Sequence, residues 1–358
     1  MRILLLLSFA LICHIQTKGQ YSRTSDFSPE KLESKYYKLK VKGTAPANLH
    51  LPFGGIKIID SRFDSSKVGF IMSKDFFRNE MTIFKKLKIR NGLAKSLEDY
   101  YNTYYENAFK PNNLKLLIII KKFWITSTNP YHHQAQGNSR NLFAGTSLHA
   151  KWELYIFKDD EALAFKRIDT VIKSELQVAD YLFDKDDSEA SSSTRINGLL
   201  NFFIEQFNYD KPVSVFRERE KKSYAKIRQI NESRFLLPVL ADSNINNGVF
   251  MNFTEFKNNE PSVKKFKENT MNYRTFKKEE YLTNDKDSLI NNYWAYTINK
   301  QTRISQYGND KLFRQGNTFE FFVKVRVSVF APPGAIKFKN YITYWVPYQL
   351  DMESEEIY

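Results

Sequence analysis

The sequence predicts an α+β fold: an N-terminal α/β sandwich with a mixed sheet and two main helices, followed by a mostly antiparallel β-rich domain. Three observations support this prediction. The apolar run Leu114–Thr126 is typical of a strand that is buried on both faces. Apolar residues recur at helical spacing in Leu93–Phe109. In Thr318–Phe330 they alternate with polar residues at the period of a half-buried antiparallel strand.

The first 19 residues have the pattern of a secretory signal peptide. Arg2 supplies the positive charge, and the apolar stretch Leu4–Ile12 is too short for a membrane anchor. Thr17 and Gly19 place small residues at positions −3 and −1 of a cut before Gln20. We therefore expect an exported protein, located in the periplasm, at the outer-membrane periphery or outside the cell. No transmembrane segment is expected after the signal is removed.

Cys13 is the only cysteine, and it lies inside the predicted signal peptide. It also allows a lipoprotein signal, but Ile12 stands before it where a small residue is expected. A mature chain without cysteine excludes disulfides, thiolate catalysis and cysteine-ligated metal sites. An exported chain of this composition fits a bacterial periplasm or exterior better than a disulfide-stapled eukaryotic ectodomain.

The length predicts two domains after the signal. Residues 20–50 form a polar lead-in with a possible edge strand at Lys35–Lys42, and residues 51–212 form the α/β domain. A tyrosine-rich helical stripe in this domain predicts core packing rather than a ligand platform. The expected strands are Ile56–Asp60, Val68–Met72, Thr82–Ile89, Leu114–Thr126 and the hairpin of Leu148–Phe157 with Leu163–Leu176, and the expected helices are Leu93–Phe109 and Thr194–Tyr209.

A charged stretch without apolar periodicity predicts a linker at residues 213–230. The β-rich domain, residues 231–358, follows. In its clearest strand, Phe319 and Phe321 belong to the apolar face, while Thr318 and Glu320 belong to the polar face. The other expected strands are Tyr293–Asn299, Thr302–Tyr307, Ile336–Val346 and a last edge strand at Tyr348–Tyr358.

The charge balance is basic. Removing Arg2 and Lys18 with the signal lowers the formal net charge from +14 to +12. Such a surface could attract an anionic lipid or polysaccharide, or nucleic acid. The basic residues are, however, scattered among acidic ones, and abundant Lys, Asn, Ile, Tyr and Phe are what AT-rich coding produces. Because a nucleic-acid protein concentrates its charge, and because export is predicted, we expect no nucleic-acid partner.

The candidate site residues are Asp60, Asp64, His132 and His133. The two histidines could bind a metal with His149 or Asp60, but they lack the spacing of a helical metal motif. Solvated loop histidines are the simpler interpretation. Asp60 and Asp64 could act as an acid and base pair, although sequence spacing says nothing about the distance between their carboxylates.

Other motifs give no support to a catalytic site. The Ser-x-x-Lys pattern Ser223–Lys226 lies in the charged stretch without its companion motifs. The acidic loop Asp184–Ser193 lacks the Gly and Glu of a calcium loop. Glycine-rich phosphate and dinucleotide loops and the Gly-x-Ser-x-Gly pattern are absent from the sequence. We assign no catalytic, metal or cofactor residue and expect no cofactor.

The segment GVFMNFTEFKNNEPS, Gly248–Ser262, resembles one in uncharacterised exported proteins of Bacteroidota. In those proteins a Trp-Gly-Tyr-like strand and a terminal Asp-Met-x-x-Gly-like strand come after it. Tyr293–Tyr296 and Asp351–Glu353 are similar here, but Ala295 replaces the Gly, and Ser and Glu stand where Thr-Gly is usual. The resemblance runs from Gly248 to the C-terminus. It implies lineage and export, and no activity comes with it.

The sequence supports two hypotheses. In the first, the protein is exported and non-catalytic, and binds an envelope component or a partner protein, such as an envelope protein or an anionic polysaccharide or lipid. In the second, it is a carboxylate-dependent hydrolase acting on envelope or carbohydrate substrates. The N-terminal strand order is loosely similar to small α/β domains of envelope accessory proteins, which is an analogy of fold alone. Carboxylates converging in a concave pocket would favour the hydrolase, whereas an exposed apolar patch or an unpaired strand would favour binding.

Overall fold

The predicted α+β class is confirmed by a computed structural model of the chain. It describes residues 30, 32–39, 41, 43–72, 84–127, 143–177, 200–201, 222–241, 244–272, 278–305, 310–329 and 340–357. Contacts between Cα atoms group Met1–Glu33 apart from Ser34–Tyr358. All elements below belong to the second group.

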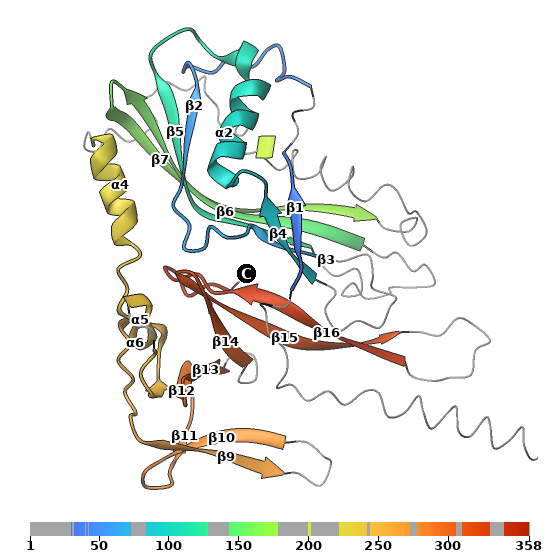
Figure 1. Ribbon diagram of the computed structural model, residues 1–358, viewed down its shortest axis with the longest axis vertical. Helices are drawn as coiled ribbons and strands as arrows, with labels where there is room; N and C mark the ends of the chain where they lie inside the picture. The colour runs from blue at the N-terminus through green and yellow to red at the C-terminus, as the bar shows by residue number, and fades with distance from the viewer. Residues whose placement is uncertain are drawn as a thin grey trace, which may run out of the picture. The chain divides into compact units, whose positions relative to one another are not determined.

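A seven-stranded mixed sheet forms the N-terminal half, in the order β1-β4-β3-β5-β6-β7, with β2 also paired to β5 (Figure 1). Pairing is parallel for β1 with β4 and for β2 and β3 with β5, and antiparallel elsewhere. The strands are β1 (Ser34–Tyr37), β2 (Ile56–Asp60), β3 (Gly69–Met72), β4 (Phe84–Ile89), β5 (Lys115–Ser127), β6 (Phe143–Lys158) and β7 (Glu161–Gln177).

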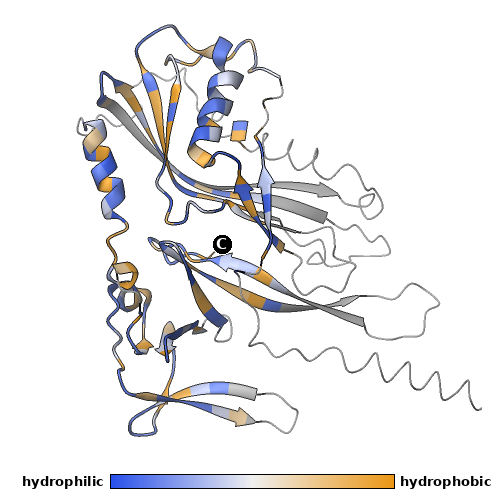
Figure 2. Cartoon of the chain, viewed as in Figure 1, coloured by the Kyte–Doolittle hydropathy of each residue, from blue (hydrophilic) through white to orange (hydrophobic). Residues whose placement is uncertain are grey.

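Strand β5 is buried on both faces, as its composition predicts. Leu116, Ile118 and Ile120 face a core that includes helix α2 (Leu93–Tyr104), which continues into a 3-10 turn, η4 (Glu106–Ala108). Leu117 and Ile119 face a second core that includes helix α4 (Tyr224–Ser233). Figure 1 shows α2 beside β2 and β5, and Figure 2 shows hydrophobic residues along both strands. Apolar side chains on both sides of one strand explain its continuous apolar run.

The tyrosine stripe of α2 packs in the core, as expected. Tyr100 and Tyr101 are buried, and their hydroxyls donate to Asn201 Oδ1 at 2.8 Å and to the Leu200 carbonyl at 3.0 Å. Because these hydroxyls form hydrogen bonds within the protein, the two rings can be buried without leaving a buried hydroxyl unsatisfied.

Strands β2 and β3 lie one after the other along the same edge of β5. The first pairs with Leu116–Ile120, and the second pairs with Ile125 and Thr126. The loop between them, residues 61–68, is therefore held against the sheet. At its end, Gly69 has a φ of +134°, and a Cβ there would lie 1.9 Å from the carbonyl oxygen of Ile125. Only glycine fits this approach.

The C-terminal half contains a six-stranded antiparallel sheet, in the order β16-β15-β14-β13-β12-β8, and a three-stranded antiparallel sheet, in the order β11-β10-β9. Helices α5 (Pro238–Ala241) and α6 (Phe253–Asn258) contribute to the aromatic core of the larger sheet. The strands are β8 (Gly248–Phe250), β9 (Phe266–Asn272), β10 (Lys278–Asn284), β11 (Leu289–Ile290), β12 (Ala295–Ile298), β13 (Gln301–Ile304), β14 (Asp310–Gln315), β15 (Thr318–Val329) and β16 (Asn340–Gln349).

Three expectations need correction. The polar face of β15 is buried at its start, since Thr318 and Glu320 are 1% and 0% exposed. The last edge strand expected at Tyr348–Tyr358 is not formed, because β16 ends at Gln349 and a turn with Glu355 at positive φ comes next. Part of the stretch predicted as a linker, residues 213–230, is helical, because α4 buries Ile227 against the sheet.

Several predictions fall outside the described residues. These are the signal peptide, most of the helix expected at Thr194–Tyr209, the acidic loop Asp184–Ser193 and both histidines of the pair. The division of the chain into domains 51–212 and 231–358 stays a prediction. Of the described helices, none is both long enough and apolar enough to span a bilayer.

Candidate functional site

The loop between β2 and β3 carries a buried ionic triad. Lys67 Nζ lies 2.5 Å from Asp64 Oδ2 and 2.5 Å from Glu320 Oε1. The three side chains are 1%, 3% and 0% exposed, respectively. Gln349 Nε2 donates to Asp64 Oδ2 at 3.4 Å. The triad therefore joins the N-terminal loop to β15 and β16 of the C-terminal sheet.

Burial and the shared ammonium act differently on the two carboxyls of the triad. Burial raises the pKa of Asp64, but the charge of Lys67 and hydrogen bonds outweigh it, so the pKa is lowered. Burial dominates at Glu320 and raises its pKa to about 7. Burial opposes the charged form of Lys67, but Glu320 and Asp64 raise its pKa overall. The same ammonium thus keeps Asp64 ionised more readily than Glu320.

A second ionic group joins β5 to the C-terminal segment, residues 350–357, which follows β16. Lys122 Nζ lies 2.7 Å from Asp351 Oδ2 and 3.0 Å from Glu356 Oε2. Lys122 and Asp351 are nearly buried, whereas the side chain of Glu356 is 64% exposed. Burial raises the pKa of Asp351, but the neighbouring Lys122 reverses this and lowers it.

A third ionic group centres on Glu353 in the same segment. Glu353 accepts from Arg234 Nε and lies 3.3 Å from Lys151 Nζ. Arg234 Nη1 also donates to the carbonyl of Ser61 at 2.7 Å. The C-terminal segment is thus tied to α4's end, to β6 and to the loop after β2. We call the three groups together the charge cluster: Asp64, Lys67, Glu320, Lys122, Asp351, Glu356, Arg234, Glu353 and Lys151.

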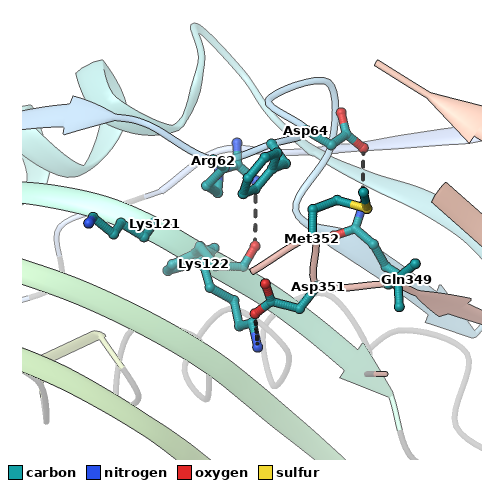
Figure 3. A pocket seen from close by; sticks show the side chains of 10 residues that line it. Arg62, Asp64, Lys121, Lys122, Gln349, Asp351 and Met352 are labelled. Atoms are coloured by element: carbon teal, nitrogen blue, oxygen red, sulfur yellow. Dashed lines mark hydrogen bonds and ion pairs between the residues drawn. The ribbon is translucent and has the colours of Figure 1, made fainter. Parts of the chain in front are cut away.

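An irregularity in β5 explains how two adjacent lysines are both buried. The register with β6 shifts between Ile120 and Lys122, as at a β-bulge. Lys121 Nζ lies 2.6 Å from Glu153 Oε1 on β6, while Lys122 reaches the C-terminal segment. In Figure 3, the side chains of Lys122 and Asp351 point toward each other, and Lys121 points away from them.

The cavity at the cluster has a volume of about 10 Å³, and Figure 3 shows several of the residues that line it. That is the space of a single water molecule. It is too small for a sugar or peptide, and the ionised groups around it are already paired with one another. Groups of three or more His, Cys, Asp or Glu side chains that could hold a metal are absent from the described residues. The arrangement can join two sheets, but it offers no room for a substrate.

The structure does not bring Asp60 and Asp64 together as an acid and base pair. Asp60 binds Arg62, with Oδ2 2.7 Å from Nη2, while Asp64 binds Lys67. His132 and His133 lie outside the described residues. His149 lies on β6 opposite Trp124, inside the sheet. Of the four candidates, only Asp64 belongs to the charge cluster.

A second, open cavity lies at the three-stranded sheet. Its volume is about 430 Å³, and its lining is mainly apolar and amide. Met271 and Leu289 in this lining are 47% and 55% exposed, which is unusual for large apolar side chains. The lining residues are Met271, Glu280, Tyr281, Leu282, Leu289, Ile290, Asn291, Asn292 and Tyr293. We call it the β10 cavity.

Comparisons with known proteins give little. No family model matches the chain, and no curated protein matches it. Among solved structures, a protein from Xanthomonas campestris that is described under the family model DUF330 matches with a TM-score of 0.29 and 11% sequence identity. The match covers 48% of this chain and 92% of that one. A minor lipoprotein from Acinetobacter baumannii matches with a TM-score of 0.22 and 9% identity, over 44% and 91%. These TM-scores are too low to show a shared fold.

Neither the charge cluster nor the β10 cavity was predicted, and only the charge cluster left a trace in the sequence. Lys121 and Lys122 interrupt an apolar strand, and buried lysines require partners. Glu320 sits between Phe319 and Phe321 in a strand, and the sequence could not show that its face meets another layer. The exposure of Leu289 depends on tertiary packing and left no trace in the local pattern.

Proposed function

We propose that the protein is exported, has no catalytic role and acts by binding an envelope component or a partner protein. The observation that supports this most is the β10 cavity, an open cavity of about 430 Å³ with two exposed apolar side chains, Met271 and Leu289. Concave, mainly apolar sites with a few polar groups are typical of binding sites. Export rests on the signal peptide expected at residues 1–19, and descent from exported Bacteroidota proteins stays part of the proposal.

The hydrolase alternative finds no comparable support among the described residues. A carboxylate mechanism needs an acid and a base that face a substrate. Asp60 is instead held by Arg62, and Asp64 is held by Lys67 beside a cavity with room for one water. The carboxyl with the pKa near 7, that of Glu320, is fully buried.

Site-specific photo-crosslinking in the native host tests the proposal. A photoreactive amino acid at Leu289 is expected to give a discrete crosslinked product with an envelope component. The matched control is the same amino acid at Leu236, which is 80% exposed and does not line the cavity. Equal crosslinking from both positions, or none from Leu289 in cells that make the protein, would contradict the proposal.

A further inference from the structure

The edge of β10 is open where β11 ends. The antiparallel ladder between them consists of Leu282 with Ile290 and Thr283 with Leu289. Strand β10 begins four residues earlier, at Lys278, and pairs there with β9 alone among the described strands. Strand β11 ends at Ile290, and Asn292, two residues later, has a φ of 56°. A stretch of backbone edge therefore borders the β10 cavity.

The hydrogen-bond alternation of the ladder shows which residue presents its backbone at this edge. Asn284 N donates to the Ser288 carbonyl at 2.9 Å, so Asn284 points its backbone polar groups toward β11. Every second residue of a strand does the same. Leu282 and then Glu280 are the next members of this series. The N–H and C=O of Glu280 thus point along the open edge, where the ladder has no further residue of β11 to meet them.

The side chains at this edge specify an alternating occupant. Met271, Tyr281 and Leu289 lie on one face of the three-stranded sheet, as diagonal neighbours on successive strands. Glu280 lies on the opposite face, with Arg303 Nη1 3.4 Å from its Oε2. A strand added at the edge would place the residue opposite Glu280 on the carboxylate's face. Its two neighbours would lie opposite Glu279 and Tyr281, on the face that carries Met271, Tyr281 and Leu289.

Charge decides between the possible classes of partner. Among the residues that the structure describes, Glu280 is the one charged side chain that lines the β10 cavity, and it is 39% exposed. Glu280 is paired with Arg303, which does not line the cavity, so an anionic lipid or polysaccharide would meet no basic residue in the described lining. A basic residue between two apolar residues complements both faces.

We propose that the β10 cavity binds an extended peptide segment of a partner protein by strand addition to β10, and that it prefers an apolar–basic–apolar pattern. This deepens the proposed binding function and rests on it. Main-chain hydrogen bonds to Glu280 supply affinity, while the alternating side chains supply selectivity.

Fluorescence anisotropy with a labelled peptide, Thr-Thr-Val-Lys-Val-Thr-Thr with blocked ends, tests this on the purified protein. We expect saturable binding with a Kd below about 1 mM. Replacing the peptide's lysine by glutamate is expected to weaken binding about fivefold, because like charges would then face each other. The protein variant Leu289→Lys is expected to weaken it about tenfold, while Leu236→Lys leaves it unchanged.

N-methylation separates strand addition from simple apolar adsorption. Methylating the backbone nitrogen of the peptide's lysine removes the N–H that would face Glu280. This is expected to weaken binding by at least about tenfold. Methylating the next valine, whose N–H points away from β10, is the matched control. Equal effects of the two methyl groups, or tighter binding of the glutamate peptide, would overturn the inference.

The two proposals fail in different ways. Absence of peptide binding together with a crosslink from Leu289 would overturn strand addition and leave the binding function standing. Absence of both would overturn both proposals.

Discussion

The charge cluster and the β10 cavity place side chains against their usual preference in opposite ways. At the cluster, the charged groups Lys67 and Glu320 are buried in the core. At the cavity, the apolar groups Met271 and Leu289 are left in solvent. The cluster is closed around a space for one water, whereas the cavity is open and more than large enough for several side chains.

The difference shows that a gathering of ionisable groups is weaker evidence for function than an exposed apolar surface. Buried ion pairs recover part of their desolvation cost from each other, so they can persist as structural joints. Exposed apolar groups gain nothing in the free protein, and binding a partner would remove them from water. Variants at both places test this division between joint and binding surface.

The largest effect is expected at Lys67. Lys67→Met leaves the carboxyls of Asp64 and Glu320 buried without their shared ammonium. We expect a loss of about 3–5 kcal/mol in the free energy of unfolding, measured by urea denaturation at pH 7. The ion pair of Lys95 with Asp99 is the matched control, since both side chains are more than half exposed. Lys95→Met should leave the unfolding midpoint unchanged, and equal effects of the two variants would remove the distinction.

The next effect depends on pH and concerns Glu320. Its pKa is raised from 4.5 to about 7, so the folded state keeps a proton that the unfolded state loses within this window. Stability therefore falls as pH rises from about 4.5 to 7. The variant Glu320→Gln lacks this fall. Between pH 4.5 and 8, its free energy of unfolding should therefore rise by on the order of 2–3 kcal/mol relative to that of the wild type.

Two other carboxyls bear on this comparison. Burial raises the pKa of Asp310 to about 6, but Asp310 is present in both proteins and cancels in their difference. The pKa of Asp64 is lowered, so the stability that its ionised form contributes is lost only at pH values below the range from 4.5 to 7. Urea unfolding of both proteins at several pH values gives the measurement. Parallel stability curves would show that Glu320 does not titrate in this range.

A smaller effect separates the two acidic partners of Lys122. Asp351→Asn removes a nearly buried partner and is expected to cost about 1–3 kcal/mol in unfolding free energy. Glu356→Gln removes a partner that is 64% exposed, and its effect should stay below about 0.5 kcal/mol. Thermal and urea unfolding of both variants check the order. A larger loss for Glu356→Gln would mean that burial does not set the strength of these pairs.

Much of the fold was predictable, because several strands carry either a continuous apolar run or an alternation of apolar and polar residues. The bounds predicted for Ile56–Asp60 are those of β2. The predicted hairpin of Leu148–Phe157 with Leu163–Leu176 is β6 and β7, which Asp159 and Asp160 connect at positive φ. The prediction was wrong where a strand face that was expected to meet solvent instead packs against another part of the protein. The polar face of β15 is buried because Lys67 meets Glu320 there, and no local pattern encodes that meeting.

The sites were far less predictable than the fold. Asp64 was named as a candidate, but as part of an acid and base pair rather than as the partner of Lys67. Glu320, which shares Lys67 with Asp64, and Gln349, which donates to Asp64, lie more than 200 positions away along the chain. The β10 cavity exists because β11 stops after two residues at the Asn291-Asn292 turn. The length of a short edge strand is set by the turn after it, so composition alone does not reveal the open edge.

The smallest effect on stability is expected at the cavity itself, where two leucines on adjacent strands offer a matched pair. Leu289 is 55% exposed and Leu282 is fully buried, and both line the cavity. Leu289→Ala should change the free energy of unfolding by less than about 0.5 kcal/mol, whereas Leu282→Ala should cost about 2–4 kcal/mol. Urea denaturation of both variants gives the comparison. If Leu289→Ala destabilises the protein as much as Leu282→Ala, Leu289 is part of the core, and its exposure no longer argues for a partner.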